Sequence, residues 1–255
     1  MPNSQIAAQL YSLRDFLKTP EDIVKTLSRV KKMGYDAVQL SALGPIDSKE
    51  LAKILKNEGL VCCATHVSVE EMRDNTQKVI DEHKLWDCKF TAIGGFFPKE
   101  PKTQDWVNFA DQFNAAVKKL DGSGITVGYH NHSHELAKYD GKTALQILLE
   151  KLSPKIWFEI DTYWIQHGGG DPIVWINKVK NRIPCVHFKD MTINNDRVQE
   201  MSEVGEGNLN WNGIIIACKE AGVQWYIIEQ DHWYGRDGFA GMEKSLKNLK
   251  AMGIK

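Results

Sequence analysis

Three histidines stand two residues apart in the stretch GYHNHSHE, residues 128–135. They are His130, His132 and His134, and Glu135 follows them directly. Imidazole binds transition metals, and its ordinary pKa of about 6.5 also lets it accept or donate a proton at neutral pH. The segment is therefore compatible with a metal site, a proton-transfer cluster or a polar loop, and its neighbours in the fold must decide among them.

Residues of metal-binding types also occur near the ends of three other apolar runs. IWFEID ends in Asp161, PCVHFKD contains His187, and VQWYIIEQD contains Glu229. With His130 on ITVGYHNH, each of the last four predicted strands contributes one such residue. Mixed imidazole and carboxylate ligands suit Mn²⁺, Co²⁺, Fe²⁺ or Zn²⁺, and Mg²⁺ stays open as an alternative. The four residues therefore predict a site for one divalent metal ion.

Each of these residues also has a structural interpretation. Glu229 would be costly to bury unpaired in an apolar strand, so an ion pair is the alternative to a metal. Asp161 could cap a turn, and His187 could be a hydrogen-bonded core histidine. Their occurrence together at equivalent strand positions favours the metal. Glu159 would lie one layer deeper than Asp161 on the same side of the strand, either supporting a ligand or forming a core ion pair.

The segments that must position these residues alternate between β-rich runs and longer amphipathic runs. The predicted strands are residues 5–11, 36–40, 60–66, 89–95, 125–132, 156–161, 184–190 and 223–231. Because helical runs separate the strands, the strands must be parallel. Eight such units in about 250 residues favour a closed (β/α)₈ TIM barrel that spans residues 1–255 as one domain. A Rossmann sheet is disfavoured, since YSLRD rather than GxGxxG follows the first strand.

In such a barrel the C-terminal ends of all strands meet at one mouth. Polar residues stand at or just beyond those ends: Gln39, His66, His130, Asp161, His187 and Glu229. The pattern predicts that the functional residues lie at this mouth of the barrel.

Composition excludes several classes of function. The 32 Lys and Arg residues against 33 Asp and Glu residues leave a net charge of -1, without the basic excess that is typical of nucleic-acid binding. No apolar run approaches the roughly 18 residues of a membrane span. MPNSQIAAQLYSLRD lacks the features of a secretory signal. The five cysteines form no CxxC pair, so we expect reduced thiols in a cytoplasmic protein.

Several motifs together resemble the sugar phosphate isomerase/epimerase superfamily of xylose isomerase-like barrels. They are QLYSLRD, GYHNHSHEL, DTYWIQHGGGDP, VHFKD and VGEGNLNW, and the likeness runs over nearly the whole chain. Members include ketose 3-epimerases and inosose dehydratases. The resemblance implies one divalent metal ion, with Asp161, His187 and Glu229 matching the ligands of the family directly. It also implies that Lys189 contacts the substrate.

One position departs from the family pattern. Many members carry Glu where this chain has His130, and in ketose epimerases that Glu works with the eighth-strand Glu to move protons on opposite faces of the substrate. The inosose dehydratases are more similar to this chain here. We expect His130 to bind the metal and His132 to carry protons or contact the substrate, with Glu135 as a source of the missing carboxylate. Glu229 would be both ligand and catalyst, and His134 part of the loop.

The predicted function is a metal-dependent sugar isomerase or epimerase that acts on a keto-sugar or related polyol through an enediolate. A dehydratase acting on a keto-inositol or 3-keto sugar by the same deprotonation is the alternative. A non-catalytic sugar-binding barrel is a lesser one, and a DNA-repair endonuclease is disfavoured by the net charge.

Substrate contacts are predicted near the strand ends. Aromatic side chains pack against sugar rings, and Tyr11 and Trp164 are placed to do so. His66 and Lys189 would contribute polar contacts, with His66 a further candidate proton carrier. The polar segment TINNDRVQEMSEVGEGNLNW is long for a loop and is a candidate lid. We expect a small sugar or polyol as ligand, no nucleic acid or membrane partner, and a homodimer as one open assembly.

Overall fold

Eight parallel strands form the closed barrel that the sequence predicts. The structure is a computed structural model that describes residues 4–255. The strands follow the order β1-β12-β9-β8-β5-β4-β3-β2 around the barrel. Their bounds are β1 (Ile6–Gln9), β2 (Ala37–Leu40), β3 (Val61–His66), β4 (Phe90–Ile93), β5 (Thr126–His130), β8 (Trp157–Asp161), β9 (Cys185–Phe188) and β12 (Trp225–Ile228).

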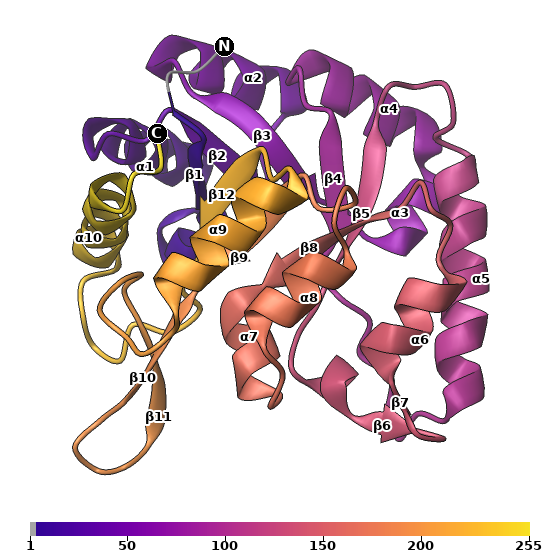
Figure 1. Ribbon diagram of the computed structural model, residues 1–255. Helices are drawn as coiled ribbons and strands as arrows, with labels where there is room; N and C mark the ends of the chain where they lie inside the picture. Colours follow the sequence, from indigo (N-terminus) through magenta and orange to yellow (C-terminus); the bar gives the residue numbers. More distant parts are fainter. Residues whose placement is uncertain (1–3) are drawn as a thin grey trace.

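Helices surround the barrel on its outside (Figure 1). They are α1 (Pro20–Lys32), α2 (Ser48–Glu58), α3 (Val69–Asp74), α4 (Thr76–Leu85), α5 (Thr103–Lys118), α6 (Ala144–Lys151), α7 (Thr162–His167), α8 (Pro172–Lys178), α9 (Trp211–Ala221) and α10 (Gly238–Ala251). Local signals set their ends: Thr19 caps α1, and Gly59, in the left-handed region at φ 64°, ends α2. Within the described residues, no helix is long and apolar enough to span a bilayer.

The interior of the barrel changes from apolar to ionisable toward the mouth. Residues two apart on one strand share its inner face and so form successive layers. The deep layer is small or apolar and includes Ala7, Ala37, Trp157, Cys185 and Ile227. Two residues further along the same strands stand the buried polar residues Gln9, Gln39, Glu159, His187 and Glu229. A further step on three of them gives Asp161, Lys189 and Asp231, which are also buried.

A single glycine makes room for the largest side chain of the deep layer. A Cβ atom at Gly128 would lie 2.4 Å from the indole of Trp157. The glycine of GYHNH is therefore a packing requirement, two residues below His130 on the inner face of β5.

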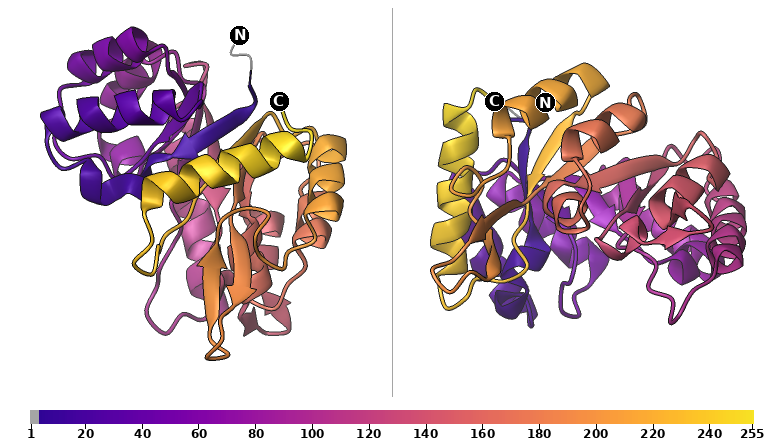
Figure 2. Two further views of the ribbon diagram at one scale, coloured as in Figure 1. Left: turned by 90° about the vertical axis from the view of Figure 1, so that its left-hand side faces the viewer. Right: turned by 60° about the horizontal axis from the view of Figure 1, so that its bottom comes forward.

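Three connections differ from the prediction. The first strand ends at Gln9, and a 3-10 helix, η1 (Leu10–Phe16), follows it. The short hairpin of β6 (Lys138–Tyr139) and β7 (Lys142–Thr143) precedes α6. The polar segment after β9, the candidate lid, contains the antiparallel hairpin of β10 (Asp190–Ile193) and β11 (Gln199–Ser202), which the sequence did not predict. That hairpin projects from the barrel as an arm (Figures 1 and 2).

Candidate metal centre and active-site cavity

The four predicted ligands come together at the mouth of the barrel. One donor atom from each of His130, Asp161, His187 and Glu229 lies within 4.8 Å of the others, and all four residues are buried. Asp161 Oδ2 is 3.3 Å from His130 Nε2 and 3.8 Å from His187 Nδ1. His187 Nδ1 is also 2.7 Å from Glu229 Oε2. The strand register accounts for this convergence, because His187 pairs with Asp161 across β8 and β9.

Asp161 has two roles, one for each carboxylate oxygen. Oδ1 accepts a hydrogen bond of 2.9 Å from the backbone N–H of Trp164 and so caps α7. Oδ2 is the oxygen that faces the histidines. The Asp161 N–H donates to Asn131 Oδ1 at 3.1 Å, which ties the ends of β5 and β8 together. The helix cap and the candidate ligand are thus compatible functions of one side chain.

Unpaired polar atoms show that the donor set fits a cation. His187 Nδ1 and Glu229 Oε2 are buried and make no hydrogen bond, although they lie 2.7 Å apart. Buried polar atoms are rarely left without a partner. Four donor atoms that converge in this way, two from imidazoles and two from carboxylates, match the ligands of divalent transition metals.

A layer of hydrogen bonds supports the ligands from below. Glu159 Oε1 lies 3.3 Å from His187 Nε2 and accepts a hydrogen bond of 2.9 Å from the Gln39 side chain. Its other oxygen lies 2.7 Å from His66 Nε2. Burial acts to raise the pKa of Glu159, but the charges of His187 and His66 outweigh burial and lower it. Glu159 is thus an ionised partner of two histidines, one of which is a candidate metal ligand.

The histidines and carboxylates set one another's charge. Burial opposes a charged His187, yet Glu159 and Glu229 raise its pKa to about 10. Burial raises the pKa of Asp161. For Glu229, burial is outweighed by the charges of Lys189 and His187, and the pKa falls well below its ordinary value.

Lys189 lies fully inside this cluster. Its Nζ is 3.1 Å from Asp161 Oδ2, 2.9 Å from Glu229 Oε2 and 2.9 Å from Asp231 Oδ2. Only the contact with Asp231 is a hydrogen bond by its geometry. Burial acts to lower the pKa of Lys189, but the three carboxylates outweigh burial and raise it well above the ordinary value. The buried side chain is therefore an ammonium ion.

A cavity of about 420 Å³ opens above the cluster. Its walls are Tyr11, Ser41, His66, Gly94, Phe97, His130, His132, Trp164, Lys189, Glu229, Asp231 and His232. All four residues predicted to contact a substrate are among them. The volume suits a small molecule of the size of a monosaccharide.

The loop after β5 separates His132 from Glu135. His132 lines the cavity, and its Nδ1 is buried without a hydrogen bond. Burial, together with the charge of His130, lowers the pKa of His132 to about 2, so the ring is neutral. Glu135 lies away from the cavity: it accepts hydrogen bonds from the Tyr129 hydroxyl at 2.7 Å and from the His132 N–H at 2.9 Å. The structure therefore does not bring the Glu135 carboxylate to the substrate.

His134 belongs to the same loop and does not reach the cavity wall. Its Nε2 lies 2.8 Å from the Phe96 carbonyl oxygen, and its Nδ1 lies 3.3 Å from Glu135 Oε2. This is the loop role that the sequence predicts for it.

Sequence reasoning missed Asp231 and His232. Asp231 stands two residues after Glu229, so the alternation of a strand would have placed both on the inner face. The strand proper ends at Ile228, however, and nothing in the run EQDH marks how far the extended chain continues.

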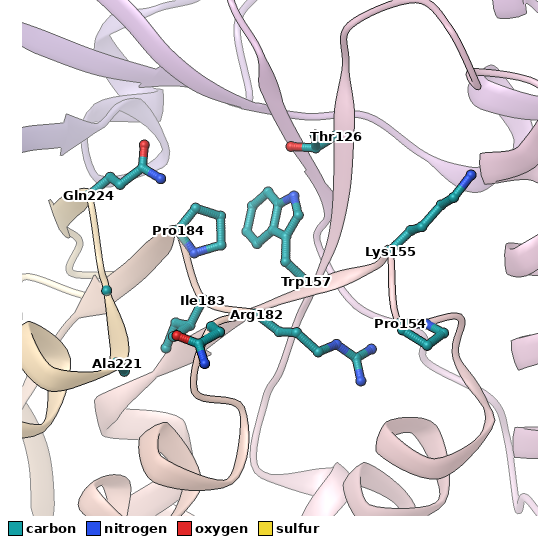
Figure 3. A pocket seen from close by; sticks show the side chains of 11 residues that line it. Thr126, Pro154, Lys155, Trp157, Arg182, Ile183, Pro184, Ala221 and Gln224 are labelled. Atoms are coloured by element: carbon teal, nitrogen blue, oxygen red, sulfur yellow. The ribbon is translucent and has the colours of Figure 1, made fainter.

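A second hollow lies at the opposite end of the barrel (Figure 3). Its volume is about 360 Å³, and its walls include Thr126 and Trp157, the first residues of β5 and β8. Arg182 also lines it, but the guanidinium donates hydrogen bonds to the carbonyl oxygens of Ile156 and Ser153. N-terminal strand ends in this fold serve stability, so the mouth is the candidate site.

Known proteins resemble the chain over much of its length. Inosose dehydratase of Geobacillus kaustophilus (strain HTA426) is 22% identical over 193 residues, which cover 66% of this chain and 61% of that protein. The match spans less than two thirds of that relative. The crystal structure of a sugar phosphate isomerase/epimerase from Parabacteroides distasonis ATCC 8503 superposes with a TM-score of 0.84 at 25% identity, covering 100% of this chain and 96% of that one.

The fold extends to more distant sequences. The structure of L-ribulose 3-epimerase has a TM-score of 0.74 at 14% identity and covers 97% of this chain and 94% of that one, which shows a shared fold. The sequence profile of the xylose isomerase-like TIM barrel family matches residues 27–252, and the chain belongs to that family.

Proposed function

We propose that the protein is a divalent-metal-dependent enzyme that removes a proton from carbon beside a carbonyl group of a sugar or polyol and returns it, as an isomerase or epimerase. The observation that carries the proposal is the cluster of His130, Asp161, His187 and Glu229 at the floor of a cavity of about 420 Å³. The names of its relatives, which include epimerases and a dehydratase, support the same chemistry.

The four ligands would hold the ion, and Glu159 would support them from below. A bound divalent ion would polarise the substrate carbonyl and stabilise the negative charge that develops on its oxygen. The second oxygen of Asp161 stays bonded to the Trp164 N–H, which fixes the direction of its carboxylate. Buried, hydrogen-bonded ligands of this kind are held in place before the substrate arrives.

Two groups on different strands are placed to move the proton. Glu229, at the end of β12, and His132, beyond β5, both line the cavity. His132 is neutral and lines the cavity, so its free ring nitrogen is placed to accept a proton. His66, paired with Glu159, lines the same cavity and is the further candidate. We assign Glu135 to the positioning of the His132 backbone.

The substrate that fits this cavity is uncharged. Among the described residues that line the cavity, Lys189 is the only lysine or arginine, and three carboxylates already surround it. A phosphate group would find acidic neighbours and no free cation. Tyr11, Phe97 and Trp164 offer aromatic faces to the C–H groups of a sugar ring.

Dehydration is the second candidate. The match to inosose dehydratase favours it. His130 on the fifth barrel strand, where the resemblance implies glutamate in many members of the family, supports the same alternative. The same carbon deprotonation would then expel a neighbouring hydroxyl group as water, with a cavity-lining histidine or Lys189 as the proton donor.

One experiment separates these reactions. The protein loaded with Mn²⁺ is incubated in D₂O with a panel of free keto-sugars and keto-inositols, and the products are analysed by NMR and mass spectrometry. Deuterium at carbon without loss of water identifies an isomerase or epimerase, and a product that has lost one molecule of water identifies a dehydratase. Saturable binding without exchange would refute both and identify a sugar-binding barrel.

A further inference from the structure

Lys189 Nζ contacts the two carboxylate oxygens that a metal ion bound by the four ligands would use. It lies 3.1 Å from Asp161 Oδ2 and 2.9 Å from Glu229 Oε2. We propose that Lys189 competes with the metal ion. In the metal-free protein its ammonium neutralises the carboxylates of Asp161 and Glu229, and it must move away from them when a divalent ion binds. This inference rests on the proposed metal-dependent function.

The competition concerns the same two oxygen atoms. Asp161 Oδ1 is committed to the Trp164 N–H, so Oδ2 is the atom that faces His130 and His187. Glu229 Oε2 is the atom that lies 2.7 Å from His187 Nδ1. An ion bound by the four ligands would therefore draw on the two oxygens that now face the ammonium.

Asp231 gives the ammonium a place to withdraw to. It is not one of the four clustered donors, and it accepts a hydrogen bond of 2.9 Å from the ammonium. A small movement of the lysine side chain away from Asp161 Oδ2 and Glu229 Oε2, with the hydrogen bond to Asp231 kept, would free both oxygens while the ammonium keeps one partner. Asp231 is therefore a positioning residue that retains Lys189 at the cavity wall when the metal is bound.

Electrostatics sets the direction of the effect. Without the ammonium, three buried carboxylates would lie close together with no lysine among them, which destabilises the metal-free protein. With the ammonium, an incoming divalent ion meets a fixed like charge a few ångströms away, which weakens its binding. The lysine thus stabilises the metal-free protein and limits its affinity for the divalent ion.

The test uses the full-length chain stripped with EDTA, wild type and Lys189→Met, titrated calorimetrically with Mn²⁺. Methionine keeps the length of the side chain and removes the charge. We expect Lys189→Met to bind Mn²⁺ at least about tenfold more tightly, with a lower melting temperature before metal is added and a larger rise in it afterwards. Lys155→Met is the matched control, since Lys155 pairs with Asp121 on the surface; it should bind as wild type does.

Equal or weaker binding by a folded Lys189→Met protein would overturn the proposal. If that variant does not fold, Asp231→Asn decides: loss of the withdrawal site should weaken Mn²⁺ binding, and unchanged binding would overturn the proposal. Mn²⁺ binding by Lys189→Met, with none by the wild type, would be the strongest support for competition between Lys189 and the metal. Absence of Mn²⁺ binding from both wild type and Lys189→Met would overturn the metal-dependent function itself, and the inference with it.

Discussion

Glu159 lies directly behind His187, with its Oε1 3.3 Å from the ring nitrogen that faces away from Glu229. One imidazole thereby joins two buried carboxylates, one on each side. When Nδ1 faces a metal, Nε2 carries the proton and donates it to Gln39 Oε1, 2.7 Å away. The Gln39 amide in turn donates to Glu159, so the carboxylate holds both the glutamine and the imidazole in place. The arrangement explains why a glutamate occupies the interior of β8.

Glu159→Gln should weaken metal binding while the fold is kept. The amide has the size of the carboxylate but no charge to orient His187 and His66. Loss of such a partner commonly costs about 10- to 100-fold in metal affinity. Calorimetric titration with Mn²⁺ measures the loss, with Glu135→Gln as a control on a buried glutamate outside the cluster. Wild-type affinity in Glu159→Gln would assign Glu159 to a core ion pair.

Asp161→Asn should abolish stoichiometric metal binding. Asparagine still offers an oxygen to the Trp164 N–H, so the helix cap survives, whereas the anionic ligand at Oδ2 is lost. Elemental analysis of purified wild type should find about one metal ion per chain, as expected for one mononuclear site, and the variant should contain none. Equal metal content in both proteins would place the ion elsewhere.

His132→Ala should separate proton transfer from metal binding. His132 lines the cavity but lies outside the four-ligand cluster, so metal content should match wild type. Turnover, followed as deuterium exchange into the substrate, should fall by about 10²- to 10⁴-fold, the usual contribution of a positioned acid or base. Retained exchange would remove His132 from the mechanism and leave His66 as the candidate.

Glu135→Gln should behave as a stability variant. The carboxylate is buried and accepts hydrogen bonds from the Tyr129 hydroxyl and the His132 N–H. The glutamine oxygen can still accept from the His132 N–H, and its NH₂ group can donate to the Tyr129 hydroxyl, but the charged acceptor of both hydrogen bonds is lost. This loss should cost about 1 to 3 kcal/mol in the free energy of unfolding. Urea denaturation measures this loss. A normal unfolding midpoint with lost turnover would return Glu135 to the catalytic role that the sequence suggests.

The barrel and the ligands could be predicted from sequence for one physical reason. Parallel strands joined by helices expose all their C-terminal ends at one mouth, so a polar residue at the end of an apolar run marks that mouth. His130, Asp161, His187 and Glu229 all carry this signal, and the structure clusters them.

The roles of Glu135 and Asp231 could not be predicted in this way. Glu135 lies in the loop beyond β5, where alternation no longer fixes the direction of a side chain. Asp231 keeps the alternation of Ile227 and Glu229, but its role depends on Lys189, which comes from another part of the barrel. Glu135 is turned outward because the Tyr129 hydroxyl lies on the outer face of β5, one residue from the inward His130. The three carboxylates around Lys189 come from β8 and the segment after β12, whereas the lysine follows β9. No local sequence pattern predicts that these groups meet.

Acid should destabilise the metal-free protein through histidines that are buried in neutral form. His83 lies outside the cluster, with its ring nitrogens 2.8 Å from Thr65 Oγ1 and 2.7 Å from the Val79 carbonyl oxygen. Burial lowers the pKa of His83, as it does for His130 and His132. Below pH about 6.5 the unfolded chain binds protons on these residues that the folded chain does not, so stability falls as the pH falls.

His187 does not reverse this trend. Its raised pKa contributes stability that is fully present below pH about 6.5 and is lost only as the pH rises toward 10. Each buried neutral histidine should therefore cost up to about 1.4 kcal/mol per pH unit below pH 6.5. Urea midpoints of EDTA-treated protein at pH 7, 6 and 5 measure how steeply the free energy of unfolding falls with pH. The His83→Gln substitution should make this fall shallower by the contribution of one histidine. A slope unchanged by His83→Gln would mean that His83 is protonated in the folded protein, and that its contacts with Thr65 and Val79 stabilise the imidazolium.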